Sequence, residues 1–288
     1  MKQIVRASAL VAGALCAPLL AQAQGRPQHL YIRVTDAGGA PVPGLSASDF
    51  EVHEGGAAPA PSIMRIALLV DTGPLVDPII KDVRASLSAF LDELPPRHDI
   101  MLGTLGRRFE VRVPTTSEYE KVKKSAQILL AERDGGTYLL DGLLETDDRL
   151  FRNAPDRRPF MVIVTTDNAD PSRVRQDVLN RRINEIYDHG VTVHAVVITH
   201  PGEDGNERDI CANLTQSTGG HLDIVSATGV ALPDKLKAIG ARLAAAHRQM
   251  SAEYAIEFQS NATSPQPIEI TVSRPDLKIE FSSPRYRQ

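Results

Sequence analysis

The sequence predicts an α/β protein with a doubly wound, mainly parallel sheet and a small antiparallel β-module formed from the two ends of the chain. Three observations predict this architecture: short continuous apolar runs in the middle of the chain, helical apolar stripes between them, and short alternating segments at both ends. With 288 residues, 42% of them hydrophobic and 24% charged, the chain is long enough to bury a sizeable core in one or two compact units.

Residues 1–23 are typical of a secretory signal peptide. Lys2 and Arg6 precede an apolar stretch, and Ala21 and Ala23 give the small-residue pattern of a cleavage site. A membrane anchor is the alternative, but the apolar stretch is shorter than the roughly 18–20 residues that a span needs. We therefore expect an exported protein, periplasmic or secreted, that does not span the membrane after cleavage.

Composition narrows the function further. Cleavage would leave 30 basic and 36 acidic residues, and this net charge of −6 gives no indication of nucleic-acid binding. Cys211 would then be the only cysteine, so no intramolecular disulfide could form. A buried, unreactive thiol is the role we expect for it.

Four apolar runs predict strands that are buried on both faces, because their apolar residues are continuous and do not alternate with polar ones. The runs span 66–70, 100–105, 160–164 and 191–198. An apolar stripe from Val76 to Leu94 predicts one helix between the first two strands, and further stripes predict helices near 119–129, 179–186 and 232–250. Alternating strands and helices indicate a mainly parallel sheet covered on both faces.

The two ends of the chain have a different pattern. Short alternating segments, typical of half-buried strands, span 30–34, 50–53, 254–258, 268–272 and 277–281. We expect them to pack together as one module. The predicted organisation is a signal peptide at 1–23, N-terminal strands of the module within 24–62, the α/β domain at 63–250, and C-terminal strands of the module within 251–288.

Oxygen-bearing side chains follow two of the predicted strands. Asp71 ends the first strand, and Asp167 follows the third. Thr137 comes after a glycine pair, at the start of a predicted helix. In an open parallel sheet the ligand crevice lies beyond the carboxyl ends of the strands, so these side chains are expected at one edge, where hard cations such as Mg²⁺ find oxygen ligands.

The segments RIALLVDTGPL, RDGGTYLLDGLL and MVIVTTDNAD resemble, in order and spacing, the metal-ion-dependent adhesion site of the von Willebrand factor type A domain. The resemblance implies that Asp71, Thr137 and Asp167 match the first, fourth and fifth ligand positions of that site. The flanks VTDAGGAPVPGLSASDFEVHEGG and PQPIEITVSRPDLKIEFSSPRY resemble the outer strands of exported bacterial proteins related to this family. The likeness therefore covers most of the mature chain.

The first loop departs from the family pattern D-x-S-x-S. Gly73 and Leu75 stand where the family has serines, and neither residue has a side-chain oxygen. Because Mg²⁺ requires near-octahedral oxygen coordination, we expect a degenerate adhesion site where no cofactor is required and magnesium binds weakly or not at all. Two alternatives stay open: Thr137 could cap a helix, and Asp71 and Asp167 could be hydrogen-bonding loop residues.

The sequence contains none of the common catalytic motifs: no G-x-S-x-G elbow, no G-x-x-x-x-G-K-[ST] phosphate loop, no G-x-G-x-x-G fingerprint and no H-E-x-x-H. We therefore expect a non-enzymatic binding or scaffolding protein that engages a protein partner at this edge. The residues expected there are Asp71, Gly73, Leu75, Thr137 and Asp167. The alternatives are a metal-dependent hydrolase that uses Asp71 and Asp167, and a purely structural component of the cell envelope.

Overall fold

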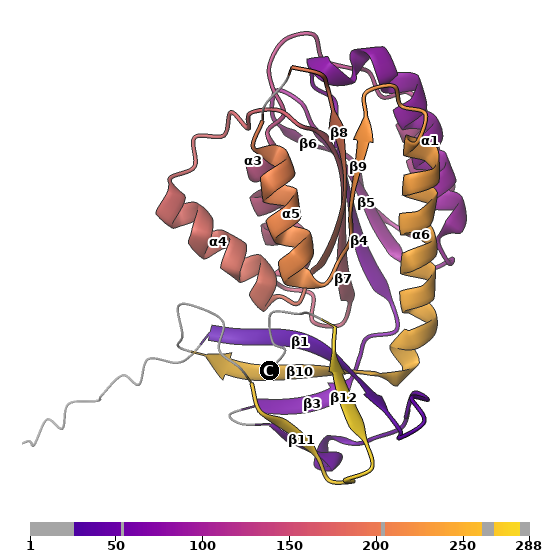
Figure 1. Ribbon diagram of the computed structural model, residues 1–288, viewed down its shortest axis with the longest axis vertical. Coiled ribbons are helices and arrows are strands. Elements are labelled where there is room, and N and C mark those ends of the chain that lie inside the picture. Colours follow the sequence, from indigo (N-terminus) through magenta and orange to yellow (C-terminus); the bar gives the residue numbers. More distant parts are fainter. Residues whose placement is uncertain (1–25, 53–54, 203–204, 261–267, 283–288) are drawn as a thin grey trace, which may run out of the picture.

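The computed structural model describes residues 26–52, 55–202, 205–260 and 268–282. Its centre is a six-stranded sheet in the order β6-β5-β4-β7-β8-β9, in which every neighbouring pair is parallel except β5 and β6 (Figure 1). The predicted mainly parallel sheet is therefore confirmed. Its strands are β4 (Met64–Asp71), β5 (Asp99–Leu105), β6 (Phe109–Thr116), β7 (Arg158–Thr166), β8 (Thr192–Thr199) and β9 (Leu222–Ser226).

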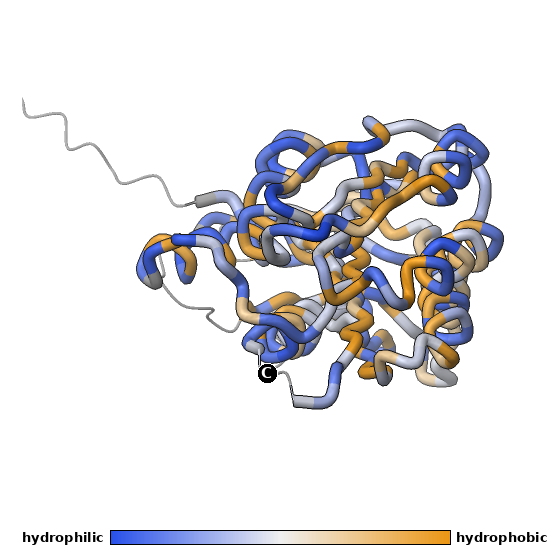
Figure 2. Tube along the Cα trace, turned by 90° about the horizontal axis from the view of Figure 1, so that it is seen from above, coloured by the Kyte–Doolittle hydropathy of each residue, from blue (hydrophilic) through white to orange (hydrophobic). Residues whose placement is uncertain are grey.

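Helices cover both faces of this sheet (Figure 1). One face packs against α1 (Ile80–Glu93), α2 (Tyr119–Gln127) and α6 (Leu232–Gln249), and the other against α3 (Leu139–Thr146), α4 (Gln176–Asp188) and α5 (Glu207–Thr218). Successive residues of β4 alternate between the two cores, with Leu68 on the first face and Leu69 on the second. This double burial explains the continuous apolar runs, and Figure 2 shows hydrophobic segments running through the interior.

The order in which strands are added to the sheet reverses between β4 and β7, which themselves run parallel. From β4 the chain crosses to β5 through α1 on one face, whereas β7, β8 and β9 are joined through α4 and α5 on the opposite face. Such a reversal leaves a crevice beyond the carboxyl ends of the two strands. The residues at these two ends are Asp71 and Asp167.

The terminal strands form the predicted antiparallel module. Its four-stranded sheet has the order β12-β1-β10-β3, and β2 pairs separately with β11. A small core of its own includes Leu30, Ile32 and Ile256. The strands are β1 (Arg26–Thr35), β2 (Phe50–Val52), β3 (Gly55–Pro59), β10 (Glu253–Ser260), β11 (Ile270–Val272) and β12 (Lys278–Phe281).

The module packs against the amino ends of the large sheet, opposite the carboxyl edge (Figure 1). Arg158, the first residue of β7, lies over the ring of Tyr31 at 3.6 Å from its centroid. Its Nε is 3.4 Å from Oε2 of Glu253, and its Nη1 donates to the carbonyl of Gly190 at 3.0 Å. Since the side chains of Arg158 and Glu253 are only 4% and 7% exposed, this ion pair is a buried junction between the two parts.

Some elements differ from the prediction. The single helix expected from Val76 to Leu94 is divided into a 3₁₀ segment, Pro74–Ile79, and α1, because Pro78 lacks the amide hydrogen that an α-helix needs. The strand β6 was not predicted, because charged residues and Pro114 interrupt its apolar residues. The expected signal peptide, residues 1–23, lies outside the described residues. In the described part of the chain, no helix is both long and apolar enough to cross a membrane.

Candidate functional site

Asp71, Thr137 and Asp167 all lie at the carboxyl edge of the sheet. Asp71 is the last residue of β4, Asp167 directly follows β7, and Thr137 precedes α3 by two residues. The strands β4 and β7 are direct neighbours. The three residues are 1%, 0% and 3% exposed, so this edge holds buried polar groups whose partners determine what the site can bind.

Asp71 connects the first loop to β7. Its Oδ1 accepts a hydrogen bond from the amide of Gly73 at 2.6 Å, and its Oδ2 accepts from the amide of Thr166 at 3.1 Å and also from the Thr166 hydroxyl. Burial raises the pKa of the Asp71 carboxyl, while these donors oppose the shift. The carboxylate therefore has a structural role in this loop whether or not it also binds a ligand.

Gly73 lies between Asp71 and Thr137. A Cβ atom at Gly73 would be 3.0 Å from Oδ1 of Asp71 and 3.0 Å from Oγ1 of Thr137, so the two oxygens approach the same point. The Thr137 hydroxyl is buried and has no hydrogen-bond partner among the residues that the structure describes. It is still close enough to lower the pKa of Asp71. The structure thus brings Asp71 and Thr137 together around a residue without a side-chain oxygen.

The alternative role of Thr137 as a helix cap is wrong. Helix α3 begins at Leu139, two residues later than expected, and has no side-chain hydrogen bond from its N-cap residue. The amide of Leu140 donates instead to Oδ2 of Asp170 at 2.7 Å. Asp170 therefore supports the start of this helix. Leu75, half-buried, adds an apolar side chain to this loop.

Asp167 faces the first turn of α5. Its Oδ1 accepts from the amide of Arg208 at 3.3 Å, and its Oδ2 lies 3.5 Å from Nη1 of the same residue. The Asp167 carboxylate thus already has a positively charged partner from its own chain.

Glu207, the residue before Arg208, is a buried acid that the sequence analysis missed. It is 0% exposed, and its Oε2 accepts from the hydroxyl of Thr165. Its Oε1 has no partner among the described residues. Burial, followed by the negative charge of Asp71, raises the pKa of Glu207 to about 10, so the carboxyl is neutral at pH 7. Acids in the first turn of a helix are usually exposed, so nothing in the sequence pattern indicates this burial.

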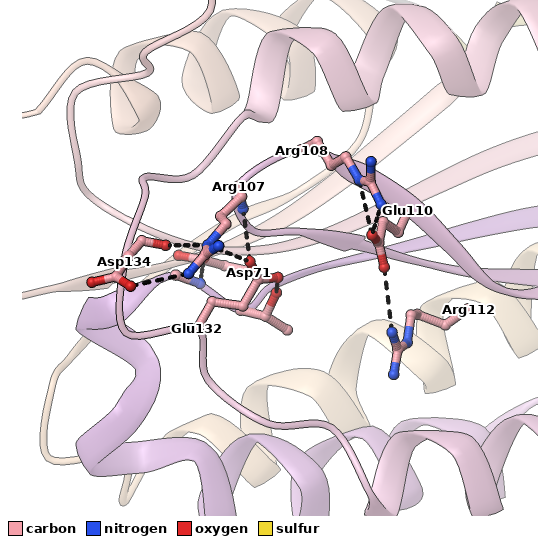
Figure 3. Close-up of polar contacts among 9 residues, drawn as sticks. Asp71, Arg107, Arg108, Glu110, Arg112, Glu132 and Asp134 are labelled. Atoms are coloured by element: carbon pink, nitrogen blue, oxygen red, sulfur yellow. Dashed lines mark hydrogen bonds and ion pairs between the residues drawn. The ribbon is translucent and has the colours of Figure 1, made fainter.

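Glu132 supports the first loop from the other side. Its amide donates to the carbonyl of Thr72 at 2.6 Å, and the Thr72 hydroxyl donates to its Oε1 at 3.3 Å. The amide of Arg107 donates to Oε2 of Glu132 at 3.1 Å, and Nη2 of Arg107 donates to Asp134 at 3.0 Å. Figure 3 shows this network beside Asp71, where it ties the first loop to the β5–β6 hairpin.

The donor set does not fit a magnesium ion. Oxygens of Asp71 and Thr137 converge, and the Thr137 hydroxyl has no hydrogen-bond partner among the described residues. Gly73 and Leu75, however, have no side-chain oxygen to add. The Asp167 carboxylate is already paired with Arg208. Among the described residues, no group of three or more His, Cys, Asp or Glu side chains is arranged to hold a metal ion. Octahedral coordination needs more organised oxygens than this edge offers.

Comparison with solved structures identifies the fold. A von Willebrand factor type A protein from Catenulispora acidiphila matches with a TM-score of 0.53 at 14% identity, over 91% of this chain and 73% of that one. This chain has the von Willebrand factor type A fold. BatB from Bacteroides thetaiotaomicron also matches, with a TM-score of 0.50 at 13% identity, over 65% of this chain and 99% of that one.

A third von Willebrand type A match is proximal thread matrix protein 1 from the mussel byssus, whose structure has a zinc-occupied adhesion site. The TM-score is 0.50 at 16% identity, and the match covers 64% of this chain and 48% of that one, so this chain spans about half of that protein. No protein-family model matches the chain, and no curated protein does. At these identities the likeness establishes the von Willebrand type A fold alone.

Proposed function

We propose that this chain is a non-enzymatic binding or scaffolding protein that engages a protein partner at the carboxyl edge of its von Willebrand type A sheet, without requiring a divalent cation. Proteins with this fold are mostly non-catalytic binding modules. The observation that carries the proposal is the convergence of Asp71 and Thr137 on Gly73, a residue without a side-chain oxygen. It supports our proposal that this edge is a degenerate adhesion site. We further propose that the protein is exported and acts in the periplasm or outside the cell.

The hydrolase alternative is less well supported. Asp71 is 1% exposed and accepts three hydrogen bonds, and Asp167 is paired with Arg208. A metal-dependent hydrolase needs an ion with an open coordination position, and a general base needs to reach its substrate. Neither carboxylate is arranged for these roles. The purely structural alternative has no observation in its favour, but it predicts a different experimental result.

Affinity capture tests the proposal. The protein is expressed from its whole sequence, so that its own N-terminal segment directs export. The purified protein is then used to capture partners from envelope extract with and without a chelator. Leu75→Asp alters the half-buried apolar side chain at the edge, and Lys278→Glu alters an exposed residue of the distant β12 as a control. We expect a protein that is captured in both conditions, lost with Leu75→Asp and retained with Lys278→Glu.

Three other results would contradict the proposal. Capture abolished by the chelator would show that a cation is required. Capture that is unaffected by Leu75→Asp would place the partner elsewhere on the molecule. The absence of any captured protein would favour the purely structural alternative.

A further inference from the structure

A groove of about 660 Å³ opens beside the first loop, between the β5–β6 hairpin and the segment that follows α2. Thr72, which directly follows Asp71 in the chain, is one of the residues that line the groove. The hairpin side carries Arg107, Arg108 and Arg112. The opposite side is formed by residues 128–132. The groove thus adjoins the candidate site. We call the side with Arg107, Arg108 and Arg112 the cationic wall and the side formed by residues 128–132 the opposite wall.

The three arginines of the cationic wall share their three carboxylate partners unevenly. Arg108 and Arg112 share one carboxylate, Glu110, at 2.8 and 3.3 Å, as Figure 3 shows. Arg107 is balanced by Glu132 and by Asp134. The side chains of Arg108 and Arg112 are 79% and 43% exposed. Two exposed guanidinium groups that share a single carboxylate retain hydrogen-bond donors for another anionic group.

The opposite wall is apolar apart from Glu132, and it is held in place. Ile128 and Leu130 are 68% and 72% exposed, whereas Leu129 between them is 1% exposed. The guanidinium group of Arg84 donates to the carbonyl of Leu129, with Nε at 2.7 Å. This anchor keeps Leu129 in the core and leaves its two neighbours in solvent. Adjacent exposed apolar side chains on a fixed segment are typical of protein contact surfaces.

We propose that this groove binds an extended acidic segment of a protein partner, whose carboxylates pair with Arg108 and Arg112 and whose apolar side chains cover Ile128 and Leu130. The inference rests on the proposed function and narrows it to a partner chemistry. Arginine beside exposed apolar residues is the composition that protein interfaces favour. Single-stranded nucleic acid fits less well, because none of the described residues that line the groove is aromatic and the bases would have nothing there to stack on.

A selection of random peptides displayed on phage, carried out on the immobilised full chain, tests this inference. Enriched sequences should combine Asp or Glu with apolar residues. Synthetic copies, measured by fluorescence polarisation, should bind at least about tenfold more weakly to Arg108→Glu/Arg112→Glu and to Ile128→Ser/Leu130→Ser, which corresponds to about 1.4 kcal/mol or more. Higher salt should also weaken binding.

Arg173→Glu/Arg175→Glu is the matched control, because Arg175 is equally exposed and pairs with Asp177 much as Arg108 pairs with Glu110. Thermal unfolding of each variant verifies that it is folded.

Three results of the selection would overturn the inference: no enrichment, enrichment of basic or neutral peptides, and equal binding of the peptides to the groove variants and the natural protein. So would an oligonucleotide that binds this groove more tightly than the peptides. A captured partner that is lost with Leu75→Asp but retained by both groove variants would contradict binding in the groove and leave the proposed function intact.

Discussion

Arg208 holds Asp167 through both its main chain and its side chain. Its amide donates to Oδ1 at 3.3 Å, and its Nη1 lies 3.5 Å from Oδ2. The aspartate side chain is 4% exposed and the arginine side chain 42%. A divalent cation that binds the Asp167 carboxylate would have to compete with the guanidinium group of Arg208. The ion pair and the missing oxygens at Gly73 and Leu75 therefore act in the same direction, against metal binding.

Replacing Arg208 with alanine is expected to raise the affinity for Mn²⁺ at least about tenfold, because Asp167 loses its fixed counter-charge while the amide of residue 208 still orients it. Mn²⁺ titrations followed by electron paramagnetic resonance measure the change. Arg175→Ala, which removes an exposed arginine from a loop ion pair, should leave the affinity unchanged. Equal Mn²⁺ binding by Arg208→Ala and the natural protein would show that the guanidinium group does not oppose the ion.

The junction between the two parts of the molecule depends on Glu253. Glu253→Ala leaves the buried guanidinium of Arg158 without its carboxylate and is expected to lower the free energy of unfolding by about 3–5 kcal/mol. Urea denaturation measures this loss. Glu145→Ala, which removes the exposed partner of Arg149, is the control and should cost less than about 1 kcal/mol. Similar losses from the two variants would mean that the buried pair contributes no more than a surface pair.

The strands from the two chain ends should depend on each other. Strand β10 pairs with β1 from Arg26↔Ser260 to Arg33↔Glu253, and it covers Leu30 and Ile32, which are 2% and 0% exposed. Deleting residues 253–288 should therefore lower the thermal midpoint and cause self-association, which calorimetry and size-exclusion chromatography detect. A deletion variant that stays monomeric and melts at the full-length temperature would refute this dependence.

His98 should make stability depend on pH. Its Nδ1 accepts the amide hydrogen of Met64 at 3.2 Å, and burial, with a smaller effect of His247, lowers its pKa from 6.5 to about 4. Between these values the unfolded chain binds the proton more readily than the folded protein does. Stability from this group is therefore complete above about pH 6.5 and declines as the pH falls toward 4.

His98→Asn retains an acceptor and removes the titration, so unfolding free energies measured from pH 7 to 4 should decline less steeply than in the natural protein. His221→Asn, the same substitution at a half-buried histidine beside Asp223, is the control for the effect of the substitution itself. An unchanged slope in His98→Asn would assign the pH dependence to other groups.

The sequence was sufficient to predict the sheet and the adjacency of Asp71 and Thr137, because strand ends and a glycine pair before a helix are local signals with known consequences for position. The sequence was not sufficient to predict that Glu207 and Arg208 lie at this edge, where Arg208 competes with a metal ion for Asp167. Glu207 and Arg208 lie in the first turn of a helix, where charged residues are ordinarily solvated, and only the packing of α5 onto β7 brings them to the edge. The strand β6 was missed for a similar reason. Its charged residues interrupt the apolar pattern because it is a partly exposed edge strand.

The most direct test of the account is a calorimetric titration with magnesium of the natural protein, Gly73→Ser/Leu75→Ser and Gly73→Ala/Leu75→Ala. The alanine pair adds the same Cβ atom 3.0 Å from Asp71 and Thr137 but no oxygen, so it controls for crowding at Gly73. We predict no saturable heat from the natural protein or the alanine pair at millimolar magnesium, and measurable binding by the serine pair. Tight binding by the natural protein, or no gain from the serine pair, would contradict the proposal that this edge is a degenerate adhesion site.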